Sequence, residues 1–176
     1  MNEMDRQKRL KRVALLCCHF IRNLAYYDAG RNEGRFVIPA SEFNVTVNGN
    51  FLDICILEWC KLFGDHNEEH HWKNIVDNKQ EFKKGLLIRL ETDDKGLENY
   101  WKLVRTYRDE FVAHLDSAET MNLPEMNLAY KAVLHYFGEI IEEYQTGPTH
   151  QGIPTDLKLY YQARLDEAKS VYQRKT

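Results

Sequence analysis

Apolar residues recur at intervals of three and four along most of this chain, and that spacing restricts the fold to packed helices. The clearest example is the range 4–28, in which one stripe is formed by Leu10, Val13, Ala14, Cys17, Phe20, Ile21, Leu24 and Tyr27. Spacing of this kind predicts an amphipathic α-helix. No stretch alternates apolar and polar residues over the length of a strand, so the sequence does not predict a sheet.

The same periodicity, read with helix-capping and helix-breaking residues, predicts five further helices. They are expected at about 49–63, at 80–90, from the capping segment 92–94 to 108, at 124–144 with Pro124 in the first helical position, and at 156–173. The length of 176 residues suits one domain with a sizeable core. We therefore predict an all-α, single-domain bundle of five to six helices over 1–176, with 1–3 and 174–176 frayed.

The composition argues against several classes of protein. No run of about 18 apolar residues is present, so no membrane span is expected, and the polar start lacks the apolar core of a secretory signal. A cytoplasmic protein without a cofactor is the expectation. Reduced, buried thiols are expected because no C-x-x-C pair is present and the cysteines fall in apolar helical stretches, namely Cys17, Cys18, Cys55 and Cys60. The net charge of −3 counts against a general nucleic-acid binder but permits a local positive groove.

The segment Tyr107–Asp116, YRDEFVAHLD, carries the most suggestive chemistry. It joins a guanidinium, a carboxylate and an imidazole through a short apolar spacer. Arginine binds phosphate with a planar, bidentate geometry. Histidine is the side chain best suited to move protons near neutral pH. Arg108, Asp109 and His114 are therefore candidates for chemistry on a phosphodiester, although residue types alone favour a surface ion pair and a half-buried histidine.

An arginine, a polar residue and a short spacer ending in histidine, all on a helix of a small helical protein, resemble the signature of the HEPN superfamily. The matching stretches are Phe51–Gly64 (FLDICILEWCKLFG) and Tyr107–Asp116, and they resemble the abortive-infection group within it. The resemblance implies a helical domain, a homodimer and, in many members, a metal-independent ribonuclease acting in stress or phage defence, with an antitoxin or partner protein in toxin–antitoxin systems. A subset with a four-residue spacer and a tyrosine two residues after the histidine differs from this chain. Here the spacer has five residues and that position is Asp116, so control by tyrosine modification is not carried over.

RNA cleavage without metal needs a base for the 2′-hydroxyl, an acid for the leaving 5′-oxygen and a cation for the charge on phosphorus. One motif supplies one histidine and one arginine, whereas two copies across a two-fold axis supply the whole set. In a regular α-helix, Arg108 and His114 would lie about 120° apart around the axis and about 9 Å apart along it. They would not share a narrow face, which also favours a composite dimer site. In this interpretation His114 is the general acid/base, Arg108 binds the phosphate and Asp109 orients Arg108 or the substrate hydroxyl.

The first predicted helix is basic on its polar side near the start, where it carries Arg6, Lys8, Arg9, Lys11 and Arg12. Two interpretations are open: a solvated face, or a patch that follows a phosphate backbone beside a nuclease cleft.

The segment His66–His70 reads H-x-x-E-H, a pattern found in inverted zinc peptidases. On a helix, His66 and His70 could bind one zinc ion with Glu69 as base. The segment follows Gly64, which is expected to stop the preceding helix, and no third ligand is evident. We therefore interpret it as a polar, histidine-rich turn, with His71 and Trp72 starting a short packing helix, and predict no metal site.

Two functions from different classes follow. The first is a metal-independent endoribonuclease of HEPN type that cleaves RNA by 2′-hydroxyl transesterification at a composite homodimer site. The second is a non-catalytic helical module of the same fold that dimerises and binds a protein or nucleotide partner, as the acidic overall charge would suit.

Overall fold

Helices form 80% of the residues that the structure describes, which makes the fold all-α and single-domain as predicted. The structure is a computed structural model, and it describes residues 3–32, 35–38, 41–113, 122–147 and 152–173. Seven α-helices lie in that part of the chain: α1 (Glu3–Ala29), α2 (Glu42–Trp59), α3 (Trp72–Ile75), α4 (Lys79–Leu90), α5 (Asp94–Tyr107), α6 (Met126–Thr146) and α7 (Leu157–Gln173). Two π-helical segments, η1 (Cys60–Gly64) and η2 (Arg108–Ala113), continue α2 and α5.

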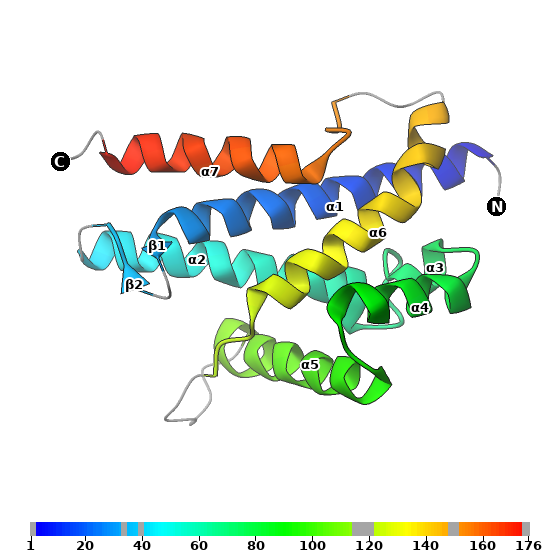
Figure 1. Ribbon diagram of the computed structural model, residues 1–176, viewed down its shortest axis with the longest axis horizontal. Coiled ribbons are helices and arrows are strands. Elements are labelled where there is room, and N and C mark those ends of the chain that lie inside the picture. The colour runs from blue at the N-terminus through cyan, green and yellow to red at the C-terminus, as the bar shows by residue number, and fades with distance from the viewer. Residues whose placement is uncertain (1–2, 33–34, 39–40, 114–121, 148–151, 174–176) are drawn as a thin grey trace.

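The long helix α1 is the centre of the bundle (Figure 1). It packs against α2, α6 and α7, and its stripe of apolar residues is buried among them from Leu10 to Leu24, while Tyr27 at the end of the stripe is partly buried. Helix α6 also contacts α4, while α5 contacts the π segment η1 at the end of α2. The short strands β1 (Arg31–Asn32) and β2 (Arg35–Phe36) form a minimal antiparallel ladder after α1.

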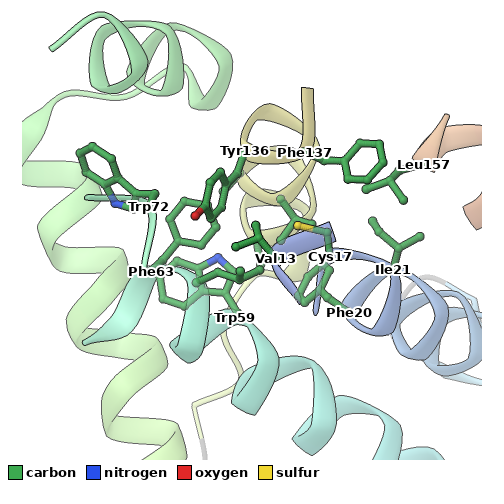
Figure 2. Packing of buried hydrophobic residues seen from close by; sticks show 14 of the residues in the cluster. Val13, Cys17, Phe20, Ile21, Trp59, Phe63, Trp72, Tyr136, Phe137 and Leu157 are labelled. Atoms are coloured by element: carbon green, nitrogen blue, oxygen red, sulfur yellow. The ribbon is translucent and has the colours of Figure 1, made fainter. Parts of the chain in front are cut away.

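Aromatic side chains fill the middle of the core (Figure 2). Trp59 stacks on Phe63 with ring centroids 5.2 Å apart, and Phe63 meets Tyr136 edge-to-face at 5.7 Å. All three side chains have no exposed surface. Burial of each such side chain stabilises the fold by about 1.5–3 kcal/mol. Tyr136 satisfies its hydroxyl by donating to the carbonyl of His70 at 3.0 Å, so the polar turn after η1 is fixed to the core.

Helix α2 begins seven residues earlier than the predicted start at Gly49. Ser41 caps it, since its hydroxyl accepts the Asn44 N–H at 3.2 Å. Asn48, which suggested a turn, is fully buried and donates to the carbonyl of Tyr27 at 2.9 Å while accepting from Arg31 at 3.0 Å. Tertiary hydrogen bonds therefore keep this asparagine within the helix.

The number and ends of the other helices differ from the predictions in small ways. The described residues contain seven helices, whereas five to six were predicted. The additional one is the four-residue α3, at the place where the sequence suggested a short packing helix. Helix α6 begins at Met126, so Pro124 precedes the helix instead of occupying its first position. The helical stretch does end at Gly64, but without a left-handed glycine. A Cβ there would lie 3.1 Å from that of Cys60, so glycine allows close packing.

Two further expectations concern thiols and membranes. All four cysteines are buried free thiols, which confirms the interpretation of their apolar setting. Within the ranges that the structure describes, no helix combines the length and the apolar character needed to cross a bilayer.

Candidate functional site

Helix α5 carries Arg108 to its position. Asp93 caps the helix by accepting the Gly96 N–H at 2.7 Å, as the sequence predicted for this segment. The apolar stripe of α5 is buried as far as Tyr107, whose hydroxyl donates to Asp53 of α2 at 3.2 Å. The end of α5 is thereby attached to α2 immediately before Arg108.

At Arg108 the backbone changes from α to π geometry and remains so to Ala113. A π turn replaces i→i+4 hydrogen bonds by i→i+5 bonds and is found mostly as a single turn, often at functional sites. The predicted motif therefore starts where the regular helix stops. The separation of about 120° was worked out for a regular α-helix, whereas the backbone from Arg108 to Ala113 is π-helical.

Arg108 and Asp109 form a close pair. One oxygen of Asp109, Oδ1, accepts from Arg108 Nε at 2.7 Å and lies 2.6 Å from Nη2. The Arg108 side chain is one quarter exposed, and that of Asp109 is half exposed. Partial burial lowers the pKa of Arg108, but the bond to Asp109 and the nearby Cys60 outweigh it and raise the pKa overall. The guanidinium is therefore charged and held in one orientation.

Cys60 also interacts with Arg108, through a side-chain hydrogen bond. Cys60 is the first residue of η1 and Arg108 is the first residue of η2, so this interaction joins the starts of the two π segments. Burial raises the pKa of the Cys60 thiol to about 11, although Arg108 opposes the shift. Cys60 is thus a neutral thiol near pH 7 and a packing partner of the arginine.

Of the three predicted site residues, the structure brings Arg108 and Asp109 together. His114 lies outside the described residues, as does Asp116. Tyr107, considered next in line for a direct role, is buried and attaches α5 to α2.

The H-x-x-E-H segment does not have the geometry of a zinc peptidase. His66 and His70 lie in turns between η1 and α3, so they do not share a helical face. Glu69, which would be the base in that pattern, pairs with Arg9 at 3.4 Å and Arg12 at 3.6 Å. Among the residues described, no group of three or more histidine, cysteine or acidic side chains could hold a metal ion. His71 instead caps α3 by accepting the Lys73 N–H at 3.1 Å, in agreement with the interpretation as a turn and a short helix.

The basic start of α1 is largely paired with acids. Arg6 makes a two-bond contact with Glu143 of α6, at 2.8 Å for each bond. Arg9 and Arg12 share Glu69, as described above. These pairs favour the structural interpretation of this face over a phosphate-following patch.

A cleft beside α5 was not foreseen from the sequence. It lies between α5, α3 and the first turns of α4, with a volume of about 480 Å³. Basic and aromatic side chains meet in it, among them Lys73, Trp101 and Arg105. A signal was present, since the pairs Trp72-Lys73 and Trp101-Lys102 each place a basic residue directly after a tryptophan.

The fold and this site define the class of protein: a single-domain, all-α protein whose central helix α1 packs against α2, α6 and α7, and whose partly exposed Arg108 guanidinium lies on a π turn. Comparison with protein-family models, with curated proteins and with solved structures gives no significant match.

Proposed function

We propose that this chain is a metal-independent endoribonuclease of HEPN type that acts as a homodimer. The observation that carries the proposal is the Arg108–Asp109 pair on the π segment at the end of α5. A guanidinium has five N–H donors, and Asp109 occupies two of them. Cys60 engages the guanidinium as well. The donors that neither Asp109 nor Cys60 uses belong to a partly exposed side chain, so they are available to a phosphate that approaches from solvent.

In the proposed reaction the 2′-oxygen of a ribose attacks the adjacent phosphorus, and the bond from phosphorus to the 5′-oxygen breaks. His114 of one subunit takes the 2′-hydroxyl proton, and His114 of the other gives a proton to the leaving 5′-oxygen. The products are a 2′,3′-cyclic phosphate and a free 5′-hydroxyl. Arg108 stabilises the charge on the phosphorane, and Asp109 fixes the guanidinium.

A gel assay with structured and unstructured RNA, in excess chelator and at several salt concentrations, tests this proposal. His114→Ala should lower cleavage by about 10²–10⁴-fold and Arg108→Ala by about 10²–10³-fold, the usual ranges for an acid/base and a charge-stabilising donor. Arg108→Lys should not restore full activity, because lysine lacks the planar fork. Arg89→Ala, which removes an exposed arginine of α4, is the matched control and should cleave like wild type.

Equal cleavage by wild type and His114→Ala would refute the assignment. Light scattering and sedimentation of the same preparations give the oligomeric state. A strictly monomeric enzyme with full activity would refute the composite site.

A second candidate function is supported by exposed apolar side chains on α2. Phe43 is 67% exposed, and Ile54 and Leu57 are each 38% exposed. Exposed apolar side chains that gather on one helix are typical of interaction surfaces. A protein that shows no chelator-resistant cleavage, yet self-associates or binds a partner protein through this face, would fit the non-catalytic module better.

A further inference from the structure

Protons in the turn before α3 can be assigned from its hydrogen bonds. His71 is fully buried, and its Nδ1 accepts the backbone N–H of Lys73 at 3.1 Å. Because a backbone N–H can only donate, this nitrogen carries no proton. Burial lowers the pKa of His71 to about 4, so its ring is neutral near pH 7 and its single proton is on Nε2. That N–H lies 3.1 Å from the carbonyl of Phe63 and 3.2 Å from Nδ1 of His66.

The tautomer of His66 follows from that of His71. Its Nδ1 faces an N–H donor, so it must be the accepting nitrogen, and the proton of the neutral ring is on Nε2. This Nε2–H lies 3.3 Å from the ammonium of Lys73, which can also only donate. Two donors therefore converge in the cleft with no acceptor between them. An anionic oxygen placed there would accept from both.

The charges around the cleft show the same excess of donors. Lys83 pairs with Asp94, and Lys102 pairs with Glu98 at 2.8 Å. These pairs use the two carboxylates that line the cleft.

Lys73 and Arg105 are the other two cations of the lining, and neither is in an ion pair with a carboxylate within the described parts of the chain. Burial, then Lys83 and Lys79, lowers the pKa of Lys73. A bound anion would relieve this repulsion.

An aromatic side chain, Trp101, lines the cleft beside these cations. The Trp101 ring is partly exposed and lies 5.3 Å from the His66 ring and 5.7 Å from Lys73 Nζ. Tryptophan provides a stacking face for any nucleobase.

The cleft lies close to the Arg108–Asp109 pair. Arg105 lies three residues before Arg108, so the cleft and that pair are about one helical turn apart along α5. The cleft volume is within the usual range of about 300–1,000 Å³ for small-molecule sites.

We infer that this cleft binds a nucleoside phosphate, with one phosphate oxygen accepting from both His66 Nε2 and Lys73 Nζ, Arg105 as a second contact and the base against Trp101. The ligand is either a free nucleotide or one nucleotide unit of an RNA strand. Only the RNA source rests on the proposed ribonuclease function, since it would place a neighbouring phosphate toward Arg108.

Titration of the full chain, followed by tryptophan fluorescence and calorimetry, tests the inference. The probes are AMP, ATP, inorganic phosphate and a 2′-O-methyl oligoribonucleotide, which cannot be cleaved by the proposed reaction. Lys73→Gln and Arg105→Gln should each weaken nucleotide binding by about tenfold or more, as expected for loss of a charge-assisted hydrogen bond. Lys95→Gln is the matched control, because it removes an exposed cation of α5 outside the cleft. The affinity of this variant for nucleotide should stay within twofold of that of wild type.

A second variant tests the proton assignment directly. His66→Phe retains an aromatic ring beside Trp101 but lacks the Nε2–H donor, so it should weaken the binding of ATP while the melting temperature stays close to that of wild type. Retention of full affinity by His66→Phe and Lys73→Gln would overturn the inference. Absence of binding by every probe would do so as well, and equal affinity for inorganic phosphate and AMP would overturn the assignment of a nucleotide.

The same experiment distinguishes a free nucleotide from RNA as the ligand. It also tests the cleft independently of the ribonuclease proposal. Tighter binding of the oligonucleotide than of ATP, lost in Lys73→Gln, assigns the cleft to RNA, and the reverse order assigns it to a free nucleotide. Arg108→Ala should bind ATP like wild type even where it abolishes cleavage. Failure of the ribonuclease proposal would therefore leave the cleft standing, and failure of the cleft would leave cleavage by Arg108 and His114 untouched.

Discussion

Acid should destabilise this protein through His71, and the size of the effect follows from its pKa. The ordinary pKa of histidine is 6.5, and burial lowers that of His71 to about 4. A lowered pKa means that the fold favours the neutral ring, so the stabilisation is complete above pH 6.5 and is lost as the pH falls toward 4. The difference corresponds to at most about 3.4 kcal/mol, of which about 2 kcal/mol should be lost between pH 7 and pH 5.

Urea unfolding at half-unit steps from pH 7.5 to 4.5 measures this loss. Other titrating groups also contribute, so the useful quantity is the difference between wild type and His71→Gln, whose amide does not titrate. His66, Lys73 and Asp65 face His71 and influence its pKa. Running the same difference in a His66→Phe background removes the other imidazole that contacts His71. Parallel pH profiles for wild type and His71→Gln would refute the buried neutral ring and, with it, the proton assignment in the cleft.

Four further substitutions test the packing of the bundle and the exposed face of α2. Gly85→Ala should destabilise the protein by about 1–3 kcal/mol in thermal melts, because its Cβ would lie 2.8 Å from a histidine ring of α6. Gly138→Ala, whose Cβ would meet open space, should stabilise the protein by about 0.5–1 kcal/mol in the same melts. Asn48→Ala should cost about 1–3 kcal/mol in urea unfolding, since it leaves the buried carbonyl of Tyr27 without its donor, and an unchanged midpoint would contradict that role. Leu57→Asp should weaken self-association in sedimentation while the monomer keeps its helical spectrum; an unchanged dimer would exclude this face of α2 from the interface.

The helical architecture could be predicted because it depends on local pattern. The apolar stripe of α1 predicted both ends of that helix to within one residue. The sequence also predicted the capping segment of α5 and the end of a helical stretch at Gly64. The early start of α2 was missed because Asn48 forms its hydrogen bonds with Tyr27 and Arg31 on other elements, and such contacts have no signature in the nearby sequence.

The candidate site was predictable in part. Arg108 and Asp109 are neighbours in sequence, so their pairing followed from residue type and position. The π geometry of η2 was not predictable from apolar spacing, because α and π turns bury similar faces over so short a segment. The cleft combines residues from a turn, α3 and α5, so only the tertiary fold brings Lys73 and Arg105 to the same place.

The π segment η2 has a consequence for how spacer lengths are compared among proteins with an arginine-to-histidine motif. Because each i→i+5 turn holds one residue more than an i→i+4 turn, the five residues Asp109–Ala113 occupy about the arc that four residues occupy in an unbroken α-helix. Chains with four and with five intervening residues can therefore be geometrically equivalent when the longer one contains such a turn. Deleting one residue from 109–113 would be expected to restore α geometry, which makes a single-residue deletion a milder change here than it would be inside α1.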